Sequence, residues 1–440
     1  TLWNGAYRRS NNDMKNLYLY TLGCKVNQYE TEALAELFND AGYNIVEDYA
    51  KAQVIIVNSC TVTANSDQKT RQAVRRFKRN NPDAVLVLCG CMPQAYPEKA
   101  TELIEADFIT GNKDHKLILD YVEKRVSDEQ IVYIPEHKKG DSFEEFEVEN
   151  FGGRTRAFIK IQDGCDRFCS YCIIPTSRGR SRSRSLENLS SELDKIKGAG
   201  YREVVLVGIN FCCYGLDIGK TFVDPIELAC SKGFDRVRIG SLEYDNISDE
   251  AIERLSKLPN FCPQFHMSLQ SGCDKTLRDM NRHYTSDEYL ALCNKLRSAF
   301  SGASITTDLM VGFAGETDED FEESLAFARK VGFEKIHVFP YSERPGTKAI
   351  LIEPKVAPSV KDERAHRAIA LANELRAEFL STQVGRTVNV LCETYENGLV
   401  QGYTENYTPV KFKSDMALNN EIVSVKIIEA MDDFVLGDRI

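Results

Sequence analysis

Gly164-Cys165-Asp166-Arg167-Phe168-Cys169-Ser170-Tyr171-Cys172 places three cysteines on one short loop, with the spacing C-x3-C-x2-C. Three thiolates can hold three irons of a 4Fe-4S cube and leave the fourth iron open to a ligand, whereas a four-cysteine cluster only passes electrons. The loop follows a predicted strand at 156–162, and a β/α barrel carries its chemistry at such strand ends. The spacing therefore predicts a ligand-binding cluster on a barrel.

Length and composition indicate a globular chain of two or three domains. The chain has 440 residues, of which 42% are hydrophobic and 10% aromatic. Its sequence contains neither an 18-residue apolar run nor the apolar core of a signal peptide, so we expect no membrane contact and a cytoplasmic location. Because Met14 leads directly into a strand, the functional chain is expected to begin there, and the origin of residues 1–13 is left open.

Fourteen cysteines in a chain expected to be cytoplasmic favour metal ligation over disulfides. Cys24, Cys60 and Cys91 each come after a predicted strand, and ligands of open parallel sheets bind at the carboxyl ends of strands. Their spacing is compatible with zinc, a second cluster or simple burial. Cys89 falls inside its strand and is interpreted as structural. Burial as small hydrophobes is expected for the cysteines 212, 213, 230, 262, 273, 293 and 392.

The pattern of apolar residues predicts an α/β protein that opens with a parallel sheet. Strand-like and helical runs alternate over 17–126, which indicates βαβ units. The predicted strands are 17–22, 53–57 and 84–88, and the predicted helices are 30–40, 67–79 and 96–106. The acidic stretch 141–150 is interpreted as a linker or an extended edge segment.

Two further segments follow the acidic stretch. Six strands alternating with helices such as 186–197 and 321–331 predict a partial (β/α)6 barrel. Those strands are 156–162, 203–207, 236–240, 264–269, 305–311 and 335–340. Short strands then predict a small antiparallel barrel of about five strands. Four of them are 387–393, 398–404, 410–413 and 422–428. The expected domains are 14–140, 151–381 and 384–440.

The run Cys165-x3-Cys169-x2-Cys172 resembles the signature of the radical S-adenosylmethionine superfamily, and other motifs resemble its methylthiotransferase branch. These motifs are Asp163-Gly164-Cys165, Ile174-Pro175, Ser177-Arg178-Gly179-Arg180, Leu269-Gln270-Ser271-Gly272, Met280-Asn281-Arg282, Asp308-Leu309-Met310-Val311-Gly312-Phe313, Gly315-Glu316-Thr317 and Tyr341-Ser342-Glu343-Arg344-Pro345-Gly346-Thr347. The resemblance spans nearly the whole chain and implies a C-terminal barrel of the TRAM type.

Two stretches distinguish subfamilies. Thr21-Leu22-Gly23-Cys24-Lys25-Val26-Asn27-Gln28-Tyr29-Glu30 and Asn58-Ser59-Cys60-Thr61-Val62-Thr63 are similar to enzymes that act on N6-threonylcarbamoyladenosine in tRNA. Enzymes for isopentenyladenosine tRNA or for a ribosomal protein usually carry other residues after these two cysteines. The chain departs from the family at Cys212 and Cys213, where small or polar residues are usual, and at Ser268 and Cys273 around the Gln-Ser-Gly motif.

The resemblance implies a mechanism with two 4Fe-4S clusters. The set Cys165, Cys169 and Cys172 would bind S-adenosylmethionine and generate a 5′-deoxyadenosyl radical, while the set Cys24, Cys60 and Cys91 would carry the sulfur that is methylated and inserted at C2 of the adenine. A reductant such as flavodoxin or ferredoxin and a sulfur donor are implied partners. No general base is nominated.

Strand-end residues are the candidate contacts to S-adenosylmethionine. They are Asn210, Ser241, Glu243, Gln270, Gly312 and Gly315. A carboxylate such as Glu243 accepts hydrogen bonds from ribose hydroxyls in other nucleoside sites. The alternative for Glu243 is a helix cap or an ion pair with Arg238.

Basic patches are needed for RNA binding because the net charge of −11 gives no general attraction. Arg71, Arg75 and Arg79 share one predicted helix face that is a candidate for RNA binding. The alternative is an ordinary solvated helix face. In a second patch, arginines occupy every other position, and an extended backbone would direct all of them to one side. They could then bind phosphates or the carboxylate of a modified base. The alternative is a disordered Ser-Arg run. This second patch consists of Arg178, Arg180, Arg182 and Arg184. In the C-terminal barrel the candidates are Tyr403, Tyr407, Lys411 and Lys413.

The leading hypothesis is a methylthiotransferase that modifies N6-threonylcarbamoyladenosine next to the anticodon. Alternative substrates are isopentenyladenosine tRNA and a ribosomal protein. A non-catalytic iron–sulfur RNA-binding protein is the alternative from another class, and the missing fourth ligand in both cysteine sets argues against it. The sequence does not specify which tRNAs are used, the sulfur source, the reductant or the oligomeric state.

Overall fold

The computed structural model describes residues 15–124 and 129–440, so the expectation about residues 1–13 lies outside the described residues. The N-terminal part is a six-stranded parallel sheet in the order β2-β1-β3-β4-β5-β6. Its strands are β1 (Asn16–Thr21), β2 (Asn44–Ile45), β3 (Val54–Ser59), β4 (Val85–Gly90), β5 (Phe108–Ile109) and β6 (Ile131–Val132). All six residues of β3 are buried, as expected for a parallel strand covered on both faces.

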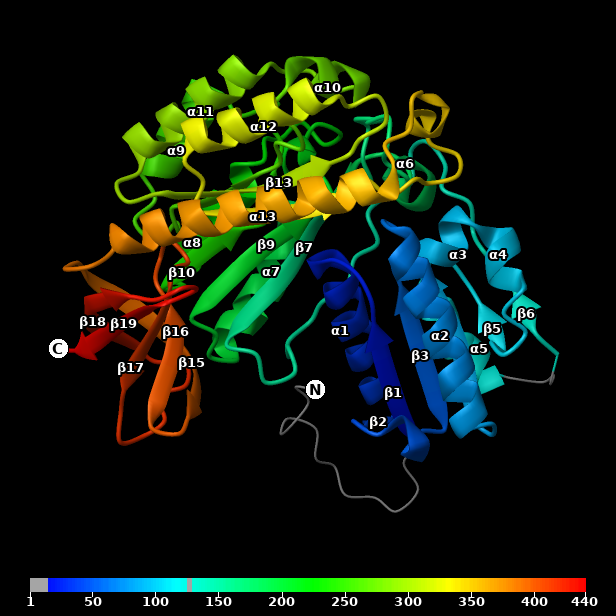
Figure 1. Ribbon diagram of the computed structural model, residues 1–440. Helices are drawn as coiled ribbons and strands as arrows, with labels where there is room; N and C mark the ends of the chain where they lie inside the picture. The colour runs from blue at the N-terminus through cyan, green and yellow to red at the C-terminus, as the bar shows by residue number, and fades with distance from the viewer. Residues whose placement is uncertain (1–14, 125–128) are drawn as a thin grey trace.

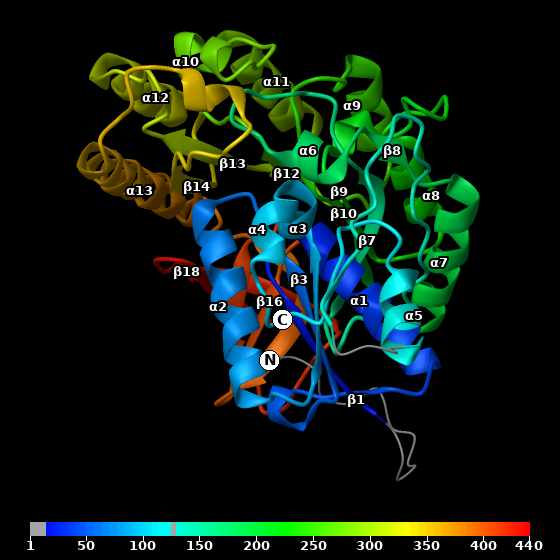
Figure 2. The ribbon, with the colours of Figure 1, turned by 90° about the vertical axis from the view of Figure 1, so that its right-hand side faces the viewer.

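Helices cover both faces of this sheet. Phe77 of α2 (Ala64–Asn80) packs on one face. On the other face, Phe38 of α1 (Lys25–Asp40) and Ile118 of α5 (Lys116–Lys124) pack together with β-strand residues. Figure 2 shows α1 and α2 on opposite sides of β1 and β3. The sheet therefore has the three-layer arrangement that the alternating sequence pattern predicts.

Two predicted helices differ in the structure. The predicted helix 96–106 is too long: α4 (Pro97–Thr101) begins near the predicted start but ends five residues early, and Pro97 separates it from α3 (Cys91–Ala95) because proline can begin a helix but cannot continue one. Helix α1 begins at Lys25, five residues before its predicted start. Its first turn carries polar side chains, including the buried Asn27, and therefore lacks the apolar periodicity of the rest of the helix.

The central part is the predicted partial barrel. Its strands are β7 (Arg156–Asp163), β9 (Glu203–Gly208), β10 (Arg236–Ile239), β12 (Gln264–Met267), β13 (Ser304–Val311) and β14 (Lys335–Pro340). They form two sheets, β10-β9-β7-β8 and β11-β12-β13-β14, which meet at a bridge between Val237 and Phe261. The short strands β8 (Arg182–Ser183) and β11 (Ser241–Leu242) complete them.

An outer layer of helices covers the barrel strands (Figure 1). It comprises α7 (Leu186–Gly198), α8 (Asp224–Ser231), α9 (Asp249–Ser256), α11 (Ser286–Ala299), α12 (Asp318–Val331) and α13 (Pro358–Ser381). Alternate strand residues such as Ile159 and Leu206 pack against these helices in the largest apolar core. The intervening residues, such as Val205, face the barrel interior, where they line a cavity or contact α1. Two short helices, α6 (Ile174–Arg178) and α10 (Asp274–Asp279), lie close to the cysteine loop in sequence or space.

The C-terminal part is a closed barrel in the order β15-β16-β17-β19-β18. Its strands are β15 (Thr387–Glu396), β16 (Leu399–Tyr403), β17 (Pro409–Lys413), β18 (Ile422–Ala430) and β19 (Val435–Arg439). The barrel was predicted to be antiparallel throughout, but β17 and β19 pair in parallel. The reason is that the β18–β19 hairpin returns β19 alongside β17 in the same direction and so closes the barrel.

The acidic stretch 141–150 forms neither a helix nor a strand. Phe143 and Val148 within it are buried, so the segment packs along the molecule rather than crossing free solvent. Within the described part of the chain, every helix is too short or too polar to cross a lipid bilayer.

Candidate active site

The first cysteine set lies on the loop that leaves β7 at the carboxyl edge of the barrel. The backbone N–H of Cys165 donates to the Gly179 carbonyl at 3.1 Å, and that of Cys172 donates to the Cys169 carbonyl at 3.0 Å. Gly164 has φ +69, and a Cβ there would overlap the carbonyl of Arg180, so glycine is required where the loop turns. Local backbone bonds thus hold the three thiols on one compact turn.

Hydrogen-bond donors surround these sulfurs. Asn210 Nδ2 lies 3.5 Å from Cys165 Sγ, and Arg282 Nη1 lies 3.6 Å from Cys169 Sγ. Burial raises the pKa of Cys165 to about 11 and raises the pKa of Cys172 further. Iron binding must displace these protons, and the donors around the sulfurs favour the thiolate form that binds metal. The donor set fits a three-cysteine cluster.

Two of the predicted cofactor contacts carry buried polar atoms with nothing to bind. Asn210 Oδ1 and Gln270 Oε1 have no hydrogen-bond partner among the described residues. Gln270 also has φ +71, which is uncommon for a residue with a side chain. Buried polar atoms are normally satisfied, so both amides fit a polar ligand at the carboxyl ends of β9 and β12.

Glu243 does not make the ion pair that its sequence context suggested. Its carboxylate accepts from Arg282 Nη2, the same guanidinium that reaches Cys169, and Arg238 pairs instead with Glu203 at 2.9 Å. The N-cap of the following helix, α9, is Ser248, so Glu243 is not a helix cap either. Glu243 therefore lies beside the first cysteine set, held there by Arg282.

The remaining predicted cofactor residues lie in a short strand and in a glycine-containing loop. Ser241 begins β11 and lines a cavity inside the barrel. Gly312 and Gly315 both have positive φ, and the ring of Phe313 between them contacts that of Tyr171 at 6.3 Å between centroids. The glycine loop therefore packs directly against the cysteine run.

The second cysteine set converges although its members are far apart in sequence. Asn27 Oδ1 lies 3.6 Å from Cys24 Sγ and 3.9 Å from Cys91 Sγ. Its Nδ2 donates to the carbonyl of Ser59, which precedes Cys60, at 2.9 Å. The carboxyl ends of β1, β3 and β4 thus bring all three thiols around one amide. Cys89, by contrast, is fully buried within β4, as predicted.

Burial also has the largest effect on the pKa of two thiols of the second set, Cys60 and Cys91. It raises the pKa of Cys91 to about 12, although Arg178 acts in the opposite direction there, and it also raises the pKa of Cys60. Asn112 Nδ2 lies 3.7 Å from Cys91 Sγ. In the described residues no three ligands meet in the geometry of a single-metal site. Three thiols around one amide fit a cluster, whose ligands bind separate irons.

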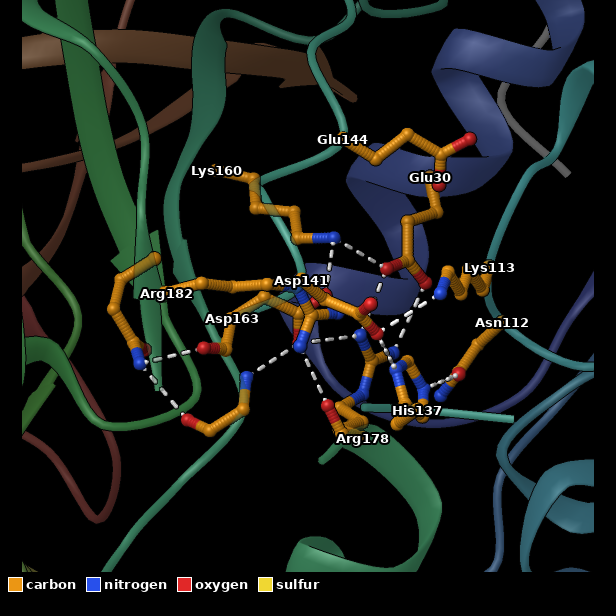
Figure 3. Close-up of polar contacts among 12 residues, drawn as sticks. Glu30, Asn112, Lys113, His137, Asp141, Glu144, Lys160, Asp163, Arg178 and Arg182 are labelled. Carbon is orange, nitrogen blue, oxygen red and sulfur yellow. Dashed lines mark hydrogen bonds and ion pairs between the residues drawn. The ribbon is translucent and has the colours of Figure 1, made fainter. Parts of the chain in front are cut away.

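A buried ion network joins the two cysteine sets, and Figure 3 shows its members Arg178, Glu30, Asp163 and Lys160. Arg178 donates to Asn27 Oδ1 at 2.7 Å, to Glu30 at 2.8 Å and to Asp163 at 3.0 Å. Lys160 lies 2.7 Å from both Glu30 and Asp163. Asp163 Oδ1 in turn accepts from the backbone N–H of Gly164 at 2.8 Å, next to Cys165. One guanidinium therefore connects the loops of both sets.

The prediction that four arginines share one exposed side is wrong. Arg178 is 0% exposed, Arg182 pairs with the buried Asp163 at 3.0 Å, and Arg184 pairs with the buried Glu192. Only Arg180 of the four is exposed, and it contacts Asp166 at 2.9 Å. The four side chains do not alternate along one extended strand, because α6 ends at Arg178 and Gly179 turns the chain. Arg178 pairs with Glu30 of α1, Arg182 with Asp163 of β7 and Arg184 with Glu192 of α7.

The other predicted RNA contacts lie at or near the surface. Arg75 and Arg79 on α2 are exposed, Arg71 is half-buried, and Arg75 lies 3.5 Å from Glu105. Lys413 on the C-terminal barrel is exposed, whereas the ammonium of Lys411 lies over the Phe434 ring.

Tyr403 and Tyr407 occupy an interface rather than an open face. Their rings stack at 4.5 Å between centroids, and Arg156 of β7 lies about equally close to both. Arg156 also pairs with Glu393 at 2.7 Å. These contacts join the C-terminal barrel to the base of the central barrel.

Sequence reasoning did not identify the residues that position the second set. Asn27 and Glu30 follow Cys24 by three and six residues, so a helix begun at Lys25 would have placed them beside it. Arg344, in the motif 341–347, donates to Thr61 Oγ1 at 2.8 Å and pairs with Asp67 at 2.6 Å. The motif 341–347 marked Arg344 as a candidate residue. Its contacts with Thr61 and Asp67, which follow Cys60 in sequence, are seen only in the folded structure.

Comparisons with known proteins agree with this geometry. Residues 16–111 match the family described as Uncharacterized protein family UPF0004, and residues 159–328 match the Radical SAM superfamily. The chain is 38% identical to the threonylcarbamoyladenosine tRNA methylthiotransferase MtaB of Bacillus subtilis, over 95% of this chain and 94% of that one. It is 34% identical to a tRNA-2-methylthio-N(6)-dimethylallyladenosine synthase of Caldicellulosiruptor saccharolyticus, over 99% and 95%.

Solved structures show the same fold at much lower identity. The radical S-adenosylmethionine methyltransferase TsrM of Kitasatospora setae superposes with a TM-score of 0.54 at 12% identity, covering 88% of this chain and 77% of that one. This likeness concerns the fold alone. The near full-length identity to the curated relatives, together with the two cysteine sets, establishes that the chain belongs to the radical-SAM tRNA methylthiotransferase family of enzymes.

Proposed function

We propose that this enzyme inserts a methylthio group at C2 of N6-threonylcarbamoyladenosine next to the anticodon of tRNA, using two 4Fe-4S clusters. The observation that carries the proposal is the pair of three-cysteine sets, each at the carboxyl ends of parallel strands and joined through Arg178. Three of the similar relatives, from Bacillus subtilis, Thermotoga maritima and Aquifex aeolicus, bear names for this modification and are 35–38% identical.

The residues around the first set divide the work of holding S-adenosylmethionine. When bound, the cluster and S-adenosylmethionine supply radical chemistry that can activate an inert C–H bond. Asn210 and Gln270 offer unpaired amide oxygens to a polar ligand, and Arg282 holds Glu243 beside Cys169. Phe313 and Tyr171 close the apolar side of the loop and limit the entry of water.

Nucleoside mass spectrometry tests the proposed function. Total tRNA from a host that lacks the modification is expected to gain 2-methylthio-N6-threonylcarbamoyladenosine when it expresses this chain, because the host supplies the precursor base. Cys165→Ala, which removes one ligand of the first set, is expected to yield none. A gain of 2-methylthio-N6-isopentenyladenosine instead would reject the proposed substrate, and unchanged tRNA would reject the activity.

Exposed arginines of α2 are proposed to bind RNA phosphates. Replacing both Arg75 and Arg79 by Gln is expected to weaken tRNA binding and to lower the salt slope of log K by about 2, because each lost phosphate contact removes about 0.9. Fluorescence anisotropy over a salt series measures the slope. Arg329→Gln, an exposed arginine of α12 paired with Glu374, serves as the matched control. An unchanged slope in the double variant would remove α2 from the RNA interface.

The reaction needs partners beyond tRNA. We propose that a reductant such as flavodoxin or ferredoxin and a separate sulfur donor act on the enzyme in the cytoplasm, where mature tRNA is found. The C-terminal barrel, with Lys411 and Lys413, is proposed to contact the RNA as TRAM-type barrels do.

A further inference from the structure

A polar cavity of about 480 Å³ lies inside the central barrel, and Lys25, the residue after Cys24, lines it. Its walls come from β7, β9, β10, β12, β13 and β14, from the first turn of α1, and from Tyr403 and Tyr407 of the C-terminal barrel. Ser241 lines it at the carboxyl end of the strands, two residues before Glu243. The volume is within the range of small-molecule sites. The cavity therefore runs from the base of the central barrel, beside the C-terminal barrel, to the strand end that carries Ser241.

Positive charge predominates in the cavity lining. Five lining side chains are cationic, namely Lys25, Arg156, Arg238, Lys335 and Arg376, and two are carboxylates, Asp308 and Glu334. The three arginines are neutralised by neighbouring acids: Arg156 by Glu393, Arg238 by Glu203, and Arg376 by Glu334 at 2.6 Å. Asp308 lies 3.3 Å from His266. The two lysines, Lys25 and Lys335, form no ion pair within the described chain, so the cavity is suited to an anion.

Lys25 is the cation of this cavity that is adjacent in sequence to the second cysteine set. Its ammonium forms no hydrogen bond or ion pair within the described chain, and its nearest aromatic contact is the Phe158 ring at 5.6 Å. Residue 25 directly follows Cys24, and α1 carries both toward the barrel. A base seated in the cavity with its C2 toward the second set would lie within reach of this ammonium.

We propose that Lys25 binds the carboxylate of the threonyl group on the target base and thereby selects an acidic N6 substituent. The inference rests on the proposed function and deepens it, because N6-threonylcarbamoyladenosine ends in a carboxylate whereas a dimethylallyl substituent is purely apolar. A charged donor bonded to a carboxylate gives a strong interaction. A site built around such a donor rejects a substrate that leaves it unpaired. Lys25 is thus a specificity residue.

The test compares substrates that differ only in the anion. Anticodon stem–loop RNAs would carry N6-threonylcarbamoyladenosine, its methyl ester or dimethylallyladenosine at the same position. Fluorescence anisotropy would measure Kd for each with the wild-type enzyme, Lys25→Gln, Lys25→Arg and Lys15→Gln. Lys15 is the matched control, a lysine of the same sheet domain whose ammonium also lies near a ring, that of Tyr43, outside the cavity.

The wild-type enzyme is expected to bind the acid about ten- to hundredfold more tightly than the ester, the effect of one charge-assisted hydrogen bond. Lys25→Gln is expected to bind acid and ester alike, while Lys25→Arg and Lys15→Gln keep the preference. If Lys25→Gln weakened all three RNAs equally, the ammonium would contact a backbone phosphate and the proposal would be overturned. Retention of the acid preference by Lys25→Gln would overturn it equally.

Two controls separate this inference from the proposed function. The ratio of Kd values is measured on metal-free and on reconstituted protein, so a loss of iron at the neighbouring Cys24 cannot be mistaken for a loss of recognition. The wild-type enzyme is assayed in parallel for 2-methylthio-N6-threonylcarbamoyladenosine. Failure of that assay rejects the proposed function, whereas product formation with an unchanged ratio in Lys25→Gln rejects only the role of Lys25.

Discussion

Arg178→Met is expected to lower the free energy of unfolding by about 3–5 kcal/mol, because the substitution leaves Glu30, Asp163 and Lys160 in a buried network that has lost its central cation. Burial alone would raise the pKa of Glu30 and of Asp163, but nearby cations outweigh it and lower both. The substitution removes the cation that contacts both carboxylates. Urea unfolding of the metal-free protein measures the change.

The matched control for this prediction is the next arginine along the chain. The side chain of Arg180 is 56% exposed, so Arg180→Met is expected to change the free energy of unfolding by less than about 0.5 kcal/mol. Equal effects of the two substitutions would show that the network contributes no more than a surface ion pair.

The same network predicts a pH dependence. Glu30 and Asp163 have lowered pKa values in the folded state, so their ion pairs contribute stability above the unfolded-state pKa that is lost as pH falls through the lower folded-state value. Arg178→Met therefore reduces the loss of stability on acidification. A parallel pH profile in the variant and the wild type would contradict this assignment.

Substitution in either cysteine set is expected to remove one cluster and leave the other. Anaerobically reconstituted wild-type enzyme should hold about eight irons, and Cys60→Ala or Cys165→Ala should hold about four. Both variants lose methylthio transfer. Only Cys165→Ala should also lose cleavage of S-adenosylmethionine to 5′-deoxyadenosine, because the two sets have different tasks. Iron and sulfide analysis, with chromatography of the small products, measures both quantities.

Cys89→Ala is the control for the second set, since Cys89 is buried in β4 and only two residues from Cys91. It is expected to retain about eight irons. A wild-type content near four irons, or no loss of iron in Cys60→Ala, would eliminate the second cluster and the proposed source of the inserted sulfur.

Local sequence patterns were sufficient for most of the architecture. The six barrel strands lie within two residues of their predicted bounds, because apolar β-branched runs between turn residues carry strand information locally. The helix 96–106 was predicted too long, since α4 ends at Thr101. The parallel pairing of β17 with β19 was missed, because the order of strands in a barrel depends on closure rather than on any one segment.

The candidate site divides in the same way. The first cysteine set was predicted from its C-x3-C-x2-C spacing and the second from positions after strands, since the carboxyl ends of parallel strands meet at one edge of a sheet. The partner of Glu243 was not predictable, because Arg282 is 39 residues away and its approach depends on how β11, β12 and α10 pack.

The sequence by itself determined the order of the three parts, the barrel strands and the placement of two groups of cysteines after strands, because periodicity and spacing act over short distances. Only the tertiary structure decided which charged side chains are buried and with which partners they pair. Arg178 is buried and connects the loops of both cysteine sets, whereas Arg180, only two residues away, lies at the surface. Lys25 lines the barrel cavity because the first turn of α1 packs against the barrel strands. Whether a charged side chain is buried depends on partners from distant segments of the chain, and local sequence patterns do not predict these partners.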